Sequence, residues 1–154
     1  MAVGIDAPTP RSAHDAPEQS PGFLLWRTTL LWQRRMRAVL APYDLTHVQF
    51  VLLTTLWWLA EHEAPPTQAR LAERAATDTM MTSQVLRRLE GRGLLERKVD
   101  PQDARARRLV LTPAGRELLA PALAAVERAD RAFFGPLEVR QAAFTSDLAT
   151  LSRE

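Results

Sequence analysis

The chain has 154 residues, of which 46% are hydrophobic and 25% charged, a composition typical of one globular domain with a sizeable core. It contains no cysteine, which excludes disulfides, thiolate metal sites and a cysteine redox switch. The formal net charge is only +2, but residues 79–108 hold eight basic and four acidic side chains, so a local charge of +4 stands against −2 elsewhere. Charge separated in this way favours binding of a polyanion through one face.

Residues 1–21 are predicted to form a flexible arm, because they combine four prolines with small polar residues and have little to bury. The first ten residues lack the charged start and apolar core of a signal peptide. The longest apolar run, residues 50–60, is too short to span a bilayer. These features predict a cytoplasmic protein with no membrane partner.

Two long helices are predicted next. The first begins near Pro21-Gly22, continues through Phe23 to Ala41 and ends at Pro42. Its apolar stripe is wide for a helix with a single neighbour, so part of it is expected to pack across a dimer interface. Thr46 is predicted to cap the second helix, His47 to about Glu61, which is apolar nearly all round and therefore buried.

Residues 67–115 are predicted to form two short amphipathic helices, a turn and a basic hairpin. Thr67 caps the first helix, and Asp78 or Thr79 caps the second. Gly91 and Gly93 are expected to end the second helix. The apolar positions expected to face the core are Leu71, Ala72 and Ala75 in the first helix and Met81, Val85, Leu86 and Leu89 in the second.

The opposite face of the second short helix carries no carboxylate. It holds Thr79, Met80, Ser83, Gln84, Arg87 and Arg88. Hydroxyls, an amide and guanidiniums suit a helix that approaches phosphates and base edges. Two short strands then flank an arginine-rich tip. This order is the winged helix-turn-helix, in which the second helix enters the major groove and the hairpin reaches the minor groove or the backbone.

Two further helices are predicted after the hairpin. Thr112-Pro113 is a helix start, because proline suits the first helical position, and apolar residues repeat after it from Leu118 to Val126. Gly135-Pro136 separates this long helix from a last one, which is expected to contain Val139, Ala142, Phe144, Leu148 and Leu151.

Several short motifs occur in a fixed order between residues 45 and 119. They are Leu45-Thr46 with Gln49, Leu89-Glu90 with Arg92-Gly93-Leu94, Asp103-Ala104-Arg105, and Leu111-Thr112 with Gly115. Together they resemble the MarR family of bacterial transcriptional regulators. The resemblance implies a mainly α fold with a small β-hairpin wing over residues 22–154: a winged helix-turn-helix lobe at 45–115, and helices at 22–42 and 113–154 that clasp a second subunit. Ala104 departs from the family, which often has a second wing arginine there.

The resemblance and the residue chemistry together suggest roles for the DNA-binding candidates. Arg105 is expected to be the wing arginine in the minor groove, with Asp103 holding its guanidinium as an ion pair; the alternative for Asp103 is a plain turn residue. Arg107 completes the basic tip. Arg87 and Arg88 are expected to grip phosphates, and Ser83 and Gln84 to read bases. Met80 either touches a thymine methyl or fills a gap in the core.

Four tryptophans are concentrated in two helices that are expected to adjoin. The candidates for a pocket that takes an aromatic or anionic effector are Trp26, Arg27, Trp57, Trp58 and His62. Packing of Trp26 and Trp57 in the core and the dimer interface is the alternative. The three histidines have no suitably spaced partners, so no metal or cofactor is expected.

No nucleophile elbow, phosphate loop or pair of catalytic carboxylates is visible, so no enzyme activity is predicted. The sequence predicts a homodimeric regulator that binds double-stranded DNA at a pseudo-palindromic operator, a ligand-responsive repressor. Two alternatives remain: a winged-helix protein-interaction module, and a small-molecule-binding protein that does not bind DNA.

Overall fold

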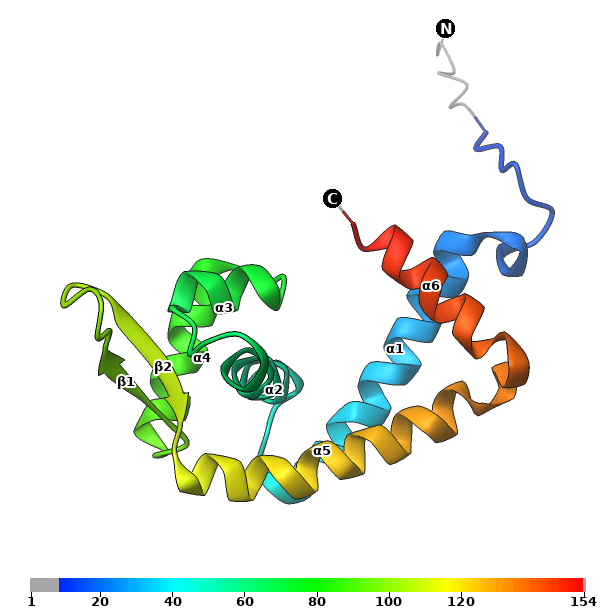
Figure 1. Cartoon of the computed structure of the whole chain (residues 1–154). Coiled ribbons are helices and arrows are strands. Elements are labelled where there is room, and N and C mark those ends of the chain that lie inside the picture. Colours follow the sequence, from blue (N-terminus) through cyan, green and yellow to red (C-terminus); the bar gives the residue numbers. More distant parts are fainter. Residues whose placement is uncertain (1–8, 154) are drawn as a thin grey trace, which may run out of the picture.

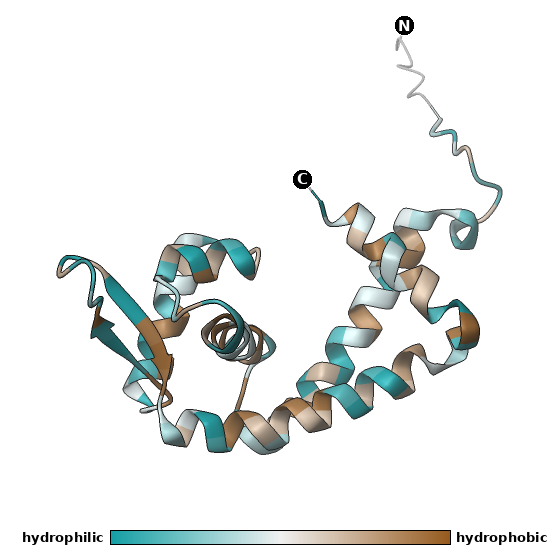
Figure 2. Ribbon diagram, in the orientation of Figure 1, coloured by the Kyte–Doolittle hydropathy of each residue, from teal (hydrophilic) through white to brown (hydrophobic). Residues whose placement is uncertain are grey.

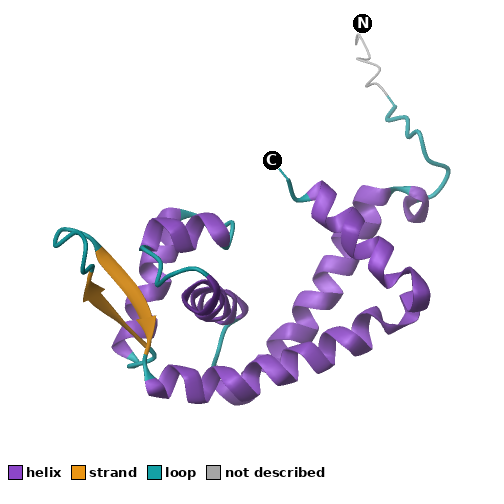
Figure 3. Cartoon of the chain, viewed as in Figure 1, coloured by secondary structure: helices purple, strands orange, loops and turns teal. Residues whose placement is uncertain are grey.

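The structure is a computed structural model that describes residues 9–153, and it is mainly helical with one β-hairpin (Figure 3). The elements, in chain order, are η1 (Pro17–Gln19), α1 (Pro21–Leu40), η2 (Ala41–Tyr43), α2 (His47–His62), α3 (Gln68–Arg74), α4 (Thr79–Gly91), β1 (Leu95–Val99), β2 (Arg107–Leu111), α5 (Pro113–Phe134), η3 (Gly135–Arg140) and α6 (Gln141–Leu151). The predicted fold class, a mainly α chain with a small hairpin wing, is confirmed.

The elements form two groups joined by α5 (Figure 1). Helices α2, α3 and α4 and the hairpin make a compact lobe, and α1 and α6 cross near the far end of α5. Helix α5 starts directly beneath the hairpin and leads away from the lobe. Any change in the angle of α5 therefore moves the lobe relative to the α1–α6 end.

The helix starts follow from capping residues close to them in sequence. Thr46 and Gln49 form a reciprocal capping box: the Thr46 hydroxyl accepts from the Gln49 N–H at 3.3 Å, and the Gln49 side chain accepts from the Thr46 N–H at 2.9 Å. The predicted caps Thr67 and Thr112 also accept from N–H groups three residues ahead. Each such cap stabilises its helix by about 1 kcal/mol.

The core of the lobe is built on α2, which Figure 2 shows as mainly hydrophobic. Its fully buried leucines contact buried leucines of α3, α4 and β2; together they are Leu52, Leu53, Leu56, Leu59, Leu71, Leu86, Leu89 and Leu109. The prediction that α2 is buried is confirmed. Because side chains from all elements of the lobe share this core, the hairpin and α4 hold fixed positions relative to each other.

Two positions differ from the prediction. Met81 is 39% exposed, and its neighbour Thr82 is buried instead, because Thr82 lies one helical turn before Leu86. The Thr82 hydroxyl donates to the Asp78 carbonyl at 2.7 Å and lies 2.8 Å from the Thr77 hydroxyl, so its burial leaves no polar group unsatisfied. Val139 lies in η3, not in the last helix, and is 95% exposed.

The predicted flexible arm is tested only at its end. Residues 1–8 lie outside the described residues. Residues 17–19, within the predicted arm, form η1, which contacts α1, and α1 begins at Pro21. None of the helices within residues 9–153 has the length and hydrophobicity that a membrane span requires.

Candidate nucleic-acid interface

The turn between α3 and α4 sets the direction in which α4 leaves the lobe. Ala76 has a left-handed backbone conformation (φ 51°), which ends α3. The Thr77 N–H then donates a hydrogen bond to the Ala72 carbonyl at 3.0 Å. Asp78 then caps α4 by accepting from the Met81 N–H at 2.8 Å. Of the two predicted caps, Asp78 is the one used. The first turn of α4 is thereby presented at the surface.

The exposed face of α4, which we call the reading face, holds the six predicted residues. Thr79, Met80, Gln84, Arg87 and Arg88 are exposed, and Ser83 is half-buried. Met80 is 73% exposed, which excludes its alternative role as a core gap-filler. Within residues 9–153, no side-chain hydrogen bond occupies Gln84, Arg87 or Arg88. The reading face therefore offers hydrogen-bonding groups to a partner.

The tip of the hairpin differs from the prediction at Asp103. Its carboxylate accepts from the backbone N–H of Arg105 at 2.9 Å, and its carbonyl accepts from the Ala106 N–H at 3.0 Å. The predicted ion pair with the Arg105 guanidinium is absent from the described structure, because the short Asp103 side chain already closes a turn on the backbone two residues ahead. Asp103 has the alternative role, that of a turn residue.

The two exposed arginines of the tip are held differently. Arg107 donates from its guanidinium to the carbonyls of Ala104 and Ala106, at 3.0 and 3.2 Å, and so braces the turn. The guanidinium of Arg105 has no hydrogen-bond or ion-pair partner in the described part of the chain. Arg105 is thus the arginine that can extend from the tip without disturbing it.

Ion pairs divide the eight basic residues of this region into two groups. Four are paired with carboxylates: Arg92 with Asp44, Arg97 with Glu90, Lys98 with Glu96, and Arg108 with Asp100. The other four, which have no carboxylate partner among residues 9–153, are Arg87, Arg88, Arg105 and Arg107. The local positive charge therefore falls on the reading face and the wing tip, which a count of charges in the sequence did not distinguish.

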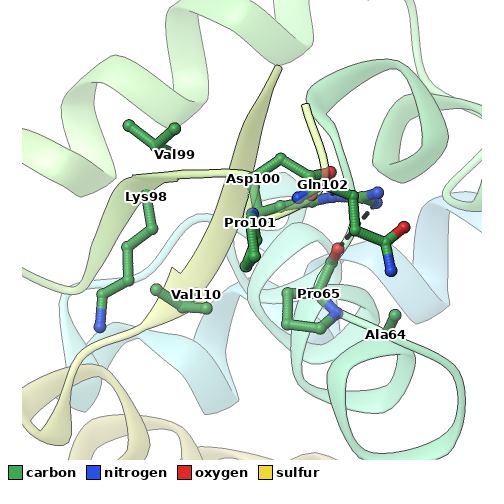
Figure 4. A pocket seen from close by; sticks show the side chains of 9 residues that line it. Ala64, Pro65, Lys98, Val99, Asp100, Pro101, Gln102 and Val110 are labelled. Atoms are coloured by element: carbon green, nitrogen blue, oxygen red, sulfur yellow. Dashed lines mark hydrogen bonds and ion pairs between the residues drawn. The ribbon is translucent and has the colours of Figure 1, made fainter. Parts of the chain in front are cut away.

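Asp100 and Arg108 order the hairpin, and Arg108 also attaches it to the rest of the lobe. Asp100 is buried, and the Gln102 N–H, at 2.8 Å, together with the Arg108 guanidinium, lowers the pKa of its carboxyl. Arg108 also donates to the Pro65 carbonyl at 3.2 Å. These residues line a cavity of about 380 Å³ between the hairpin and the loop before α3, in which Asp100 and Pro65 face each other (Figure 4). Arg108 therefore has a structural role.

The five predicted ligand residues do not line one pocket. Trp58 stacks on His62, with ring centroids 4.6 Å apart, and the Arg74 guanidinium lies 5.0 Å from the Trp58 ring. Trp57 lines a cavity that Trp58 does not reach, because successive residues of a helix point about 100° apart. Trp26 and Arg27 lie near the start of α1, where Arg27 pairs with Glu18 at 3.6 Å. Within the single chain, these five residues therefore do not share one cavity.

Two groups of polar residues at the cavities and helix junctions were missed from the sequence. Arg116 lines the Trp57 cavity, of about 320 Å³, and donates to Glu61 at 2.9 Å. Trp32 donates from its indole N–H to Asp130 at 2.8 Å and contacts His47, whose pKa is lowered by burial. Trp32 therefore links α1 to α5 and to the start of α2. The residues in each group are distant in sequence, and no local pattern pairs them.

The geometry defines a class of protein. A helix-turn-helix presents its second helix with hydroxyl, amide and guanidinium groups outward, and an adjoining hairpin carries an extended arginine at its tip. Winged helix-turn-helix proteins bind duplex DNA with these two elements, the second helix and the hairpin.

Comparisons with known proteins give the family. The model of the MarR family matches residues 45–106. The HTH-type transcriptional regulator YdcH of Bacillus subtilis is 48% identical over 123 residues, covering 80% of this chain and 84% of the relative. The repressor Rv2887 of Mycobacterium tuberculosis is 34% identical over 119 residues, covering 77% of this chain and 80% of the relative. The chain belongs to the MarR family of transcriptional regulators. The family consists of regulators and not of enzymes, in agreement with the prediction.

Solved structures share the fold over most of both chains. The repressor CouR bound to a 23-mer DNA duplex superposes with a TM-score of 0.79 and 30% identity, covering 88% of this chain and 94% of CouR. Rv2887 in complex with salicylic acid superposes with a TM-score of 0.67 and 30% identity, covering 92% and 100%. One relative is thus seen with DNA and another with an aromatic acid.

Proposed function

We propose that this regulator acts as a homodimeric repressor that binds a pseudo-palindromic operator in double-stranded DNA and is released by a small ligand. The observation that carries the proposal is the reading face of α4 beside the unpaired Arg105 of the wing tip, within residues 9–153. Ser83 and Gln84 would read base edges, with Met80 against a thymine methyl, while Thr79, Arg87, Arg88 and Arg107 would contact the backbone. Arg105 would enter the minor groove.

The proposal of a dimer is supported by apolar side chains that α1 leaves uncovered. Leu24, Leu25, Trp26 and Leu31 are exposed in the single chain, as are Leu148 and Leu151 of α6, and Leu25 and Leu148 line one cavity between α1 and α6. Exposed apolar side chains gathered at one end of a chain are typical of a protein–protein interface. A second copy packed there would hold two reading faces at a fixed separation, as half-sites about one helical turn apart require.

The proposal of a ligand is supported by the Trp57 cavity. It combines an indole, two leucines and the guanidinium of Arg116, which suits an aromatic acid. Glu61 accepts from Arg116 at 2.9 Å and so marks a position that a ligand carboxylate would take. Because this cavity lies between α2 and α5, a ligand there would bias the angle of the lobe. A ligand that prefers an angle unsuited to DNA would lower operator affinity.

The test is selection of bound fragments from random duplex DNA, followed by titration of the selected site with wild type and Arg105→Ala. Arg105→Ala is expected to weaken operator binding by about tenfold or more, because it removes a minor-groove arginine from each subunit. Arg128→Ala, a change at an exposed arginine of α5, should bind like wild type. Unchanged thermal unfolding of both variants would show that the fold is intact.

Two outcomes would contradict the proposal. If wild type binds no duplex even at low salt, the lobe is better explained as a protein-interaction module. If an aromatic acid binds tightly but operator affinity is the same with and without it, the coupling free energy between the two sites is zero and the ligand is not a regulator of DNA binding.

A further inference from the structure

A groove rich in arginine lies beside α4. It is open to solvent and encloses about 730 Å³. Its residues come from the end of α1, the segment from η2 to the start of α2, the end of α4 and the position just after α4. Three guanidiniums line it, those of Arg37, Arg88 and Arg92, against the single carboxylate of Asp44. Such a concentration of positive charge in a groove suits an anion.

The groove adjoins the reading face on the side away from the wing. Arg88 belongs to both, because it lies one helical turn after Gln84 and also lines the groove. The other edge of α4 faces the hairpin, where Glu90 accepts from Arg97 of β1 at 3.1 Å. The reading face is therefore flanked by the wing on one side and by the groove on the other.

A helix seated in the major groove has phosphates on both sides. The major groove is about 12 Å wide, close to the diameter of a helix with its side chains, so both edges of the helix approach a backbone. We infer that the groove formed by Arg37, Arg88 and Arg92 binds a backbone phosphate of duplex DNA on the strand opposite the wing. The inference rests on the proposed function and adds Arg37 and Arg92 to the DNA contacts.

The guanidiniums of the three arginines differ in how far they are already held by hydrogen bonds and ion pairs. Arg92 is positioned by the Asp44 carbonyl, which accepts from its guanidinium at 2.7 Å, while the Asp44 carboxylate lies 3.6 Å away and is almost fully exposed. The guanidiniums of Arg37 and Arg88 have no hydrogen-bond or ion-pair partner within residues 9–153. The positive end of the α2 dipole adds to the potential in the groove. Asp44 is the one side chain that opposes an anion.

The experiment measures operator affinity of the full chain as a function of salt. Arg37→Gln should weaken binding to the operator and to unrelated duplex by the same several-fold factor, and lower the salt slope by about one per half-site, because one phosphate contact is lost in each. Arg128→Gln, which removes the same charge from α5, should change neither. Asp44→Asn should strengthen binding, and asparagine tolerates the left-handed backbone at this position (φ 50°).

The outcomes separate this inference from the proposed function. If wild type binds no duplex, the proposed function fails and the groove has no role on DNA. If wild type binds but Arg37→Gln keeps the wild-type slope and Asp44→Asn does not bind more tightly, the groove holds no phosphate. If inorganic phosphate, at constant ionic strength, binds the wild type equally well with and without operator, and Arg37→Gln loses that binding, the groove holds a free anion and the inference is overturned.

Discussion

Gly115 is a single position on which the joint between hairpin and α5 depends. A Cβ at this residue would lie 1.9 Å from the Leu94 carbonyl oxygen, whereas a Cβ at Gly91 would meet nothing within 4 Å. The Leu94 carbonyl also accepts from the Thr112 N–H at 3.2 Å, so it cannot move aside without loss of that bond. The absence of a side chain at Gly115 thus allows α5 to start against the hairpin.

Gly115→Ala is therefore expected to destabilise the fold by about 2 kcal/mol or more, since backbone must shift to remove the overlap. Thermal unfolding measures the change. Gly91→Ala is the matched control, and it should be neutral or stabilise by up to about 1 kcal/mol, because alanine is the better helix former. Equal effects of the two substitutions would show that the close approach to Leu94 is not a constraint.

Among the elements, the hairpin is held to the lobe by backbone-directed polar contacts as well as by the core. Arg108 donates to the Pro65 carbonyl and pairs with Asp100 within the hairpin, and the Leu109 N–H donates to the Pro66 carbonyl at 2.8 Å. These bonds fix the angle at which the wing leaves the lobe, and with it the position of Arg105 relative to α4.

The contribution of Asp100 should depend on pH. Its pKa is lowered in the folded state by the Gln102 N–H and by Arg108, so its stabilising effect is present above the unfolded pKa of about 4 and is lost as pH falls through the folded value. Asp100→Asn is expected to be less stable than wild type at pH 7, with the difference shrinking below about pH 4. Urea unfolding across this range measures it. A difference that does not change with pH would mean that the charge of Asp100 is not what stabilises the wing.

At the scale of the whole molecule, α5 connects the DNA-binding lobe to the α1–α6 end (Figure 1), where α1 leaves apolar side chains exposed. Leu31, 51% exposed in the single chain, lies on this surface. If two copies pack there, α1, α5 and α6 set the separation of the two reading faces. A ligand between α2 and α5 would then change that separation through the angle of α5.

Leu31→Glu should then shift the protein from dimer to monomer, because it places a charge in an apolar interface. Sedimentation measures the mass, and operator binding should fall with it. Arg34→Glu puts the same carboxylate on an exposed, already charged position of α1 and should leave the dimer in place. A wild type that sediments as a monomer would end the proposal of a homodimer.

The sequence by itself determined the helices, their caps and the face of α4. The caps at Thr46, Thr67, Asp78 and Thr112 act on N–H groups within three residues, and helical periodicity compares side chains one turn apart. Both are local, so they can be predicted without the fold. The same locality explains the error at Met81, since two adjacent residues near the edge of a helix face differ only in which neighbour covers them.

The tertiary structure alone decided which charges are free and which side chains share a cavity. Arg108 is paired with the buried Asp100, and Arg92 lies beside the exposed Asp44. Trp57 and Trp58 line different cavities, and Arg37 and Arg88, 51 positions apart in the sequence, line the same groove. The physical reason is distance: electrostatic and packing partners are set by proximity in space, which depends on how the elements pack and not on the order of residues along the chain.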